Sequence, residues 1–80
     1  MYRIGDKVKV SGKNDNDNYE TFRDKVLIVE DIATSNNDTC AYDSSMKGMQ
    51  LMVFTTEQGE DVPFSLYEYE VEYAKGWKNA

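Results

Sequence analysis

The chain has 80 residues, of which 40% are hydrophobic and 30% charged, and its net charge is −6. A chain this short buries only about 60–65% of the surface that its unfolded form exposes, which leaves little room for a deep catalytic cleft. Histidine is absent and Cys40 is the single cysteine, so an intrachain disulfide, a Cys/His zinc site and a nucleophile–histidine pair are excluded. We therefore expect a small protein with no cofactor and no bound metal.

The longest apolar runs are VLIV (26–29) and LMVF (51–54), and both are far shorter than the ~18 residues that indicate a membrane span. The N-terminal stretch MYRIGDKVKV lacks the apolar segment of a signal peptide. We expect a cytoplasmic protein with no membrane partner. Residues 1–74 are expected to form one domain, followed by a short C-terminal tail over residues 75–80.

The first predicted strand follows a turn at Gly5. Apolar and basic side chains alternate in the stretch IGDKVKV (4–10), which indicates a half-buried strand with Ile4, Val8 and Val10 on its inner face. The next stretch, SGKNDNDNYE (11–20), is rich in Asn and Asp, which favour turns over strands, and it predicts a long polar loop. An EF-hand loop starting at Asp15 would need a glycine and a glutamate where Glu20 and Val26 stand, so no calcium site is expected.

Further strands are predicted from the apolar pattern. KVLIVEDIA (25–33) has four consecutive aliphatic residues, as expected for a central or strongly bent strand. A second polar loop over 34–48, with a short strand over 39–42, leads to a third strand, MQLMVFTT (49–56). EQGE (57–60) predicts a hairpin turn into a fourth strand over 61–64, which Pro63 places at an edge or a bulge. A helical turn over 65–68 then leads to a fifth strand over 69–73, with Tyr69, Val71 and Tyr73 facing inward.

These elements predict an all-β fold, a small five-stranded SH3-like barrel with two long loops and a short helical turn before the last strand. The segments IGDKVKVSG, KVLIVEDI and VPFSLYEYEVEY resemble those of KOW-type domains, a branch of the SH3-like barrels. The resemblance implies binding to RNA, ribosomes or transcription complexes. This chain has Phe22-Arg23-Asp24-Lys25 at the place where such domains carry a glycine before the second strand. In this alternative function the residues that would bind nucleic acid are basic: Arg3, Lys7, Lys9, Lys13, Arg23 and Lys25.

The distribution of charge favours protein over nucleic acid as the partner. Residues 26–80 carry three basic and ten acidic side chains, and this net charge of −7 repels a phosphate backbone. Loops on a rigid barrel are common recognition sites, and aromatic residues and Met are enriched in interfaces. The partner-binding residues predicted in the two loops are Tyr19, Phe22, Tyr42 and Met46. The alternative for these four residues is that they fold over the core and cover the open ends of the barrel. We expect a non-enzymatic protein-binding module, present as a monomer or a weak homodimer.

A third interpretation rests on the acidic residues near the C-terminus. On a strand over 69–73 and the residue before it, Glu68, Glu70 and Glu72 would project from one face about 7 Å apart, a spacing comparable to that of phosphates. These three residues are added to the predicted partner-binding set, and the alternative function is an acidic inhibitor that mimics nucleic acid. Catalysis is not expected, because Cys40 lies between Asp38 and Asp43 and lacks the basic neighbours that activate a thiol.

Overall fold

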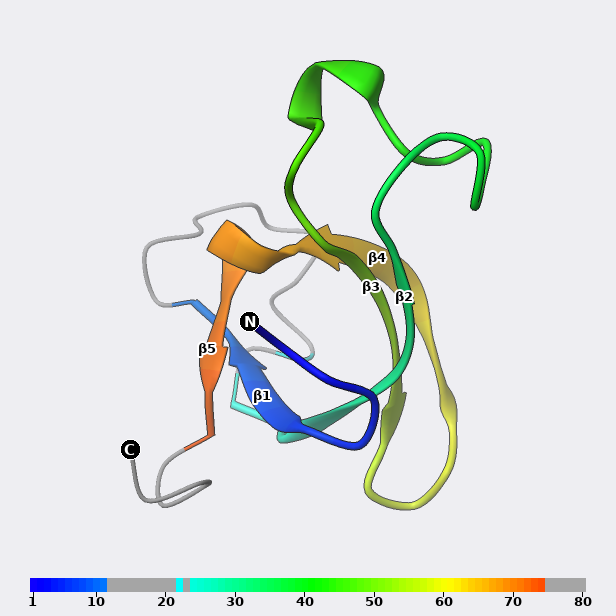
Figure 1. Cartoon of the computed structure of the whole chain (residues 1–80). Helices are drawn as coiled ribbons and strands as arrows, with labels where there is room; N and C mark the ends of the chain where they lie inside the picture. The colour runs from blue at the N-terminus through cyan, green and yellow to red at the C-terminus, as the bar shows by residue number, and fades with distance from the viewer. Residues whose placement is uncertain (12–21, 23, 75–80) are drawn as a thin grey trace.

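The computed structural model describes residues 1–11, 22 and 24–74, and Figure 1 shows the course of the chain. Its five strands form one antiparallel sheet with the order β4-β3-β2-β1-β5. The strands are β1 (Lys7–Val10), β2 (Leu27–Ala33), β3 (Leu51–Thr56), β4 (Asp61–Tyr67) and β5 (Val71–Tyr73). Short 3-10 turns form η2 (Ser44–Met46) and η3 (Glu68–Glu70). No helix among the described residues is long and apolar enough to cross a membrane.

The all-β prediction is confirmed, as is the helical turn before the last strand. The turn lies three residues later than predicted, because β4 continues to Tyr67 and Leu66 pairs with Met52 of β3. The strand predicted over 39–42 is wrong, since this segment forms turns and the Tyr42 N–H donates to the Thr39 carbonyl at 3.2 Å. In the described sheet β4 and β5 are the two edge strands, so the sheet is open between them.

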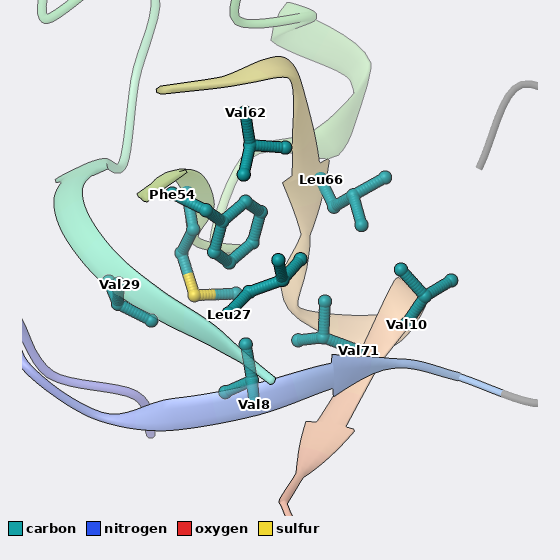
Figure 2. Packing of buried hydrophobic residues seen from close by; sticks show 9 residues of the cluster. Val8, Val10, Leu27, Val29, Phe54, Val62, Leu66 and Val71 are labelled. Carbon is teal, nitrogen blue, oxygen red and sulfur yellow. The ribbon is translucent and has the colours of Figure 1, made fainter. Parts of the chain in front are cut away.

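The core lies on the inner face of the strongly curved sheet, and Figure 2 shows its side chains pointing toward one another. Every strand contributes to it, because apolar residues alternate along each strand with residues that face outward. Phe54, Leu66 and Val8 are at most 1% exposed. The cluster consists of Val8, Val10, Leu27, Val29, Met52, Phe54, Val62, Leu66 and Val71.

Two irregularities in strand pairing bend the sheet. In β2 the residue Glu30 is extra, because Val29 pairs with Phe54 while Asp31 already pairs with Val53. In β4, residues 62–64 stand opposite Phe54 alone, between the pairs that Ser65 and Asp61 make with β3. Pro63 lies in this second bulge and on an edge strand, as the sequence predicted, so its missing N–H leaves no gap in a central ladder.

The chain turns sharply before β1, which corrects the predicted position of Ile4. The Asp6 N–H donates to the Arg3 carbonyl at 3.0 Å, and the Asp6 carboxylate accepts the Arg3 N–H at 2.9 Å. Gly5 adopts a φ of +94°, a left-handed conformation that residues with a Cβ avoid. Ile4 therefore lies at the tip of a turn, with 67% of its surface exposed, and not on the inner face of the strand.

A buried glutamine joins the N-terminal segment to the rest of the fold. The Gln50 side chain accepts the Tyr2 N–H and donates to the Tyr2 carbonyl, each at 2.8 Å, and is 6% exposed as a residue. The Gln50 backbone N–H donates to the Glu68 carboxylate at 2.7 Å, and its carbonyl accepts the Glu68 N–H at 2.8 Å. Tyr2 also donates from its hydroxyl to the Val71 carbonyl at 3.2 Å. Gln50 thus links the N-terminus, β3 and η3.

The Tyr2 hydroxyl gives the fold a defined response to alkaline pH. Burial raises its pKa above the ordinary tyrosine value of about 10, and the nearby Tyr73, Glu68 and Glu72 act in the same direction. The unfolded chain therefore loses this proton first, and the stability that the neutral hydroxyl contributes is complete below pH ~10 and declines above it. We expect the difference in unfolding free energy between the wild type and Tyr2→Phe to shrink from pH 9 to pH 11 in urea titrations. A difference that stays constant over this range would contradict the expectation.

Candidate functional site

The second loop is held against the outer face of β3 and β4 by two tyrosines. The buried Tyr42 hydroxyl lies 2.6 Å from the carbonyl oxygens of both Met46 and Met49, and it closes the loop around η2. The Tyr67 hydroxyl of β4 accepts the Asp43 N–H at 2.7 Å, and the two tyrosine rings meet edge to face at 5.5 Å. Tyr42 and Met46 thus lie together in the second loop, where Tyr42 is buried and supports the loop.

The carboxylate of Asp43 fixes the start of η2 and keeps a negative charge at the surface. It accepts hydrogen bonds from the Ser45 N–H at 2.9 Å and from the Ser45 hydroxyl at 2.8 Å. These two bonds hold the pKa of Asp43 below its ordinary value. The second loop therefore presents a fixed acidic group next to Tyr67.

Tyr69 in η3 is the exposed aromatic residue of this region. Its ring lies nearly parallel to that of Tyr67, with a centroid distance of 6.4 Å and an angle of 11°. The residue is 61% exposed, whereas the sequence predicted that it faces inward on the last strand. The prediction is wrong because residues 68–70 form a 3-10 turn, in which the two-residue alternation of a strand does not apply. Tyr42, Tyr67 and Tyr69 form a continuous aromatic row, which we call the tyrosine row.

The three C-terminal glutamates do not share one strand face, so the predicted acidic ladder is wrong. Glu68 binds the Gln50 N–H, and the Glu70 carboxylate accepts the Tyr67 N–H at 3.0 Å. Both belong to η3, while Glu72 lies in β5, is exposed and pairs with Lys9 of β1. The regular spacing on which mimicry of a phosphate backbone depends is therefore not formed.

The other predicted loop residues are placed elsewhere. Phe22 is half-buried and meets Phe64 of β4 edge to face at 5.4 Å, with the Lys25 ammonium 5.5 Å from its ring centre. Phe22 also packs against the core cluster, as expected for an aromatic side chain that covers one end of the fold. Tyr19 lies outside the described residues.

The described basic residues of the nucleic-acid alternative are dispersed and partly paired with acidic ones. The Lys7 ammonium lies 3.6 Å from the Glu57 carboxylate, and Lys9 stands opposite Glu72 in the strand register of β1 and β5. Arg3 is exposed at the turn before β1. Lys25 lies over the Phe22 ring as described above, whereas Lys13 and Arg23 lie outside the described residues.

An open groove of about 430 Å³ on the outer face of the sheet was not predicted from the sequence. Its floor comes from neighbouring strands, with Val53 of β3 and Ser65 of β4 paired to each other and Ala33 of β2 paired to Leu51. Leu51 in turn pairs with Tyr67, so the groove lies beside the tyrosine row. One feature of the sequence indicates an apolar outer surface, because MQLMVFTT carries apolar residues on both of its faces and not only on the inner one.

Comparisons of the chain with known protein families, with characterised protein sequences and with solved structures give no match.

Proposed function

We propose that this chain is a non-enzymatic protein-binding module built as a five-stranded SH3-like barrel. The strand order, the long connection between β2 and β3 and the 3-10 turn between β4 and β5 support that architecture. The observation that carries the function is Tyr69, which is 61% exposed while its ring is stacked on the fixed Tyr67. An exposed tyrosine held in one orientation loses little conformational entropy on binding, and tyrosine is enriched at the residues that dominate interface energies.

The partner is a protein, and the chain acts as a monomer or a weak homodimer. Asp43 and Glu70 place acidic groups next to Tyr67, which favours a basic partner surface and repels nucleic acid. Cys40 is exposed in the second loop, and a single exposed thiol supports a reducing compartment such as the cytoplasm.

Substitution of Tyr69 by serine tests this function. Immobilised wild-type chain should capture a protein from a lysate of the source cells. The same bait with Tyr69→Ser should retain about 10-fold less of that protein, or even less. Tyr69→Phe should keep most of the binding, because the ring supplies most of the contact area. Since Tyr69 is exposed, the free energy of unfolding of the serine variant should differ from that of the wild type by no more than about 0.5 kcal/mol.

Gln58→Ser, in the exposed hairpin turn over 57–60, is the control for unspecific effects of a serine substitution, and it should leave capture unchanged. Equal capture by wild type and Tyr69→Ser would contradict the proposed surface. Capture of nucleic acid that is lost steeply with rising salt would instead support the KOW-like alternative.

A further inference from the structure

The groove on the outer face is lined by both apolar and acidic side chains. Asp31, Val53 and Ser65 form one row across β2, β3 and β4, since Val53 pairs with both of the others. Cross-strand side chains in such a row lie about 5 Å apart. Val53 is 39% exposed although β3 is a central strand, so an apolar side chain lies open to solvent beside a carboxylate.

The bulge in β2 is what places Asp31 in this row. Leu27 and Val29 face inward, and strict alternation would turn the carboxylate of Asp31 into the core as well. The extra residue Glu30 reverses the alternation, so that Asp31 lies opposite the outward-facing Val53 and Ile32 packs against the core. The bulge therefore moves a charge from the inner face to the groove.

The second carboxylate of the groove is Asp38 in the second loop. One of its oxygens accepts the Thr34 N–H at 2.9 Å and the Thr34 hydroxyl at 3.4 Å, which fixes the side chain. Asp31 similarly accepts the N–H of Ile32 at 2.9 Å. Among the described residues neither carboxylate forms an ion pair, and the groove lining there contains no basic side chain.

We propose that this groove binds a lysine or arginine side chain of a partner polypeptide, next to an apolar residue of the same segment. The aliphatic stem would lie on Val53, which is 39% exposed, and the cationic end would meet Asp31 and Asp38. Lysine and arginine side chains combine an apolar stem with a charged end in this way, and a fixed carboxylate gives them a charge-assisted hydrogen bond. The inference rests on the proposed protein-binding function and adds the chemistry of the partner.

The test is selection of random 12-residue peptides, displayed on phage, against the full-length chain. The selected peptides should be enriched in lysine or arginine adjacent to an apolar residue. Dissociation constants of synthetic versions, measured by fluorescence anisotropy, should rise about 10-fold or more when Asp31→Asn and Asp38→Asn are combined. The amide carbonyl of each asparagine still accepts the local hydrogen bonds, so the fold is retained. Backbone amides of Ala41, Val53 and Ser65 should shift in NMR spectra of the complex.

The matched control removes two acidic charges from the exposed hairpin, by Glu60→Gln combined with Asp61→Asn. Unspecific attraction would weaken equally in both double variants, and that result would overturn the inference. The inference would also be overturned if the selected peptides lacked a basic residue and their binding were lost in Tyr69→Ser. That result would leave the proposed function intact. Recovery of no peptide would contradict this groove as a peptide site, and capture from the lysate would then decide the proposed function separately.

Discussion

Replacing Phe54 by alanine is expected to lower the free energy of unfolding by about 3–5 kcal/mol, the usual cost of truncating a buried aromatic residue. Phe54 is 1% exposed and lies at the centre of the core cluster that Figure 2 shows. A domain of this size is stabilised by only about 4–12 kcal/mol in total, so the loss is a large fraction of that stability. Equilibrium unfolding in urea, followed by circular dichroism, measures the effect.

The neighbouring Val53 provides the control for this prediction. It follows Met52 and precedes Phe54 on β3 but faces outward, so Val53→Ala should cost less than about 1 kcal/mol. Phe54→Leu, a smaller change of volume, keeps the comparison measurable if Phe54→Ala does not fold. Equal costs for Val53→Ala and Phe54→Leu would show that the two faces of β3 are assigned wrongly.

The second large effect is expected at Gln50. Gln50→Ala removes both side-chain hydrogen bonds to Tyr2, and the Gln50 residue is only 6% exposed. Each bond contributes about 0.5–1.5 kcal/mol, and the Tyr2 backbone groups lose their partner, so we expect a loss of about 2–3 kcal/mol. Hydrogen exchange of the Tyr2 amide should accelerate with the loss of its acceptor.

Gln58→Ala is the matched control, because it makes the same substitution in an exposed hairpin turn. It should change the unfolding free energy by less than about 0.5 kcal/mol. If Gln50→Ala were no more destabilising than Gln58→Ala, Gln50 would not hold the N-terminal segment in the way that the hydrogen bonds indicate.

The strands of this fold were predictable from local alternation of apolar and polar residues. The pattern KVKV marks β1, and the run of aliphatic residues marks β2. Pro63 indicated the bulge at the edge strand because a residue without an N–H is excluded from a central ladder. The end of β4 was not predictable in this way, since SLYEYEVEY continues to alternate across η3 although only its first and last parts are strands.

The candidate site was less predictable because it depends on register and on tertiary contacts. Asp31 reaches the groove only through the extra residue at Glu30, and no local pattern distinguishes that bulge from a regular strand. Tyr42 was predicted as a partner-binding residue of a loop, and in the structure its hydroxyl binds carbonyls four and seven residues later and the residue is buried. The polar residues of a small domain can thus serve the fold itself, and composition alone does not separate them from binding residues.

We propose that a protein partner binds the outer face of β3 and β4, at the tyrosine row and the adjacent groove. The most direct measurement is an NMR titration of the ¹⁵N-labelled chain with the captured partner. Under this proposal the largest shifts fall on residues 38–43, 51–53 and 65–70. Shifts concentrated on Arg3, Lys7 and Lys9, with the outer face of β3 and β4 unaffected, would contradict it.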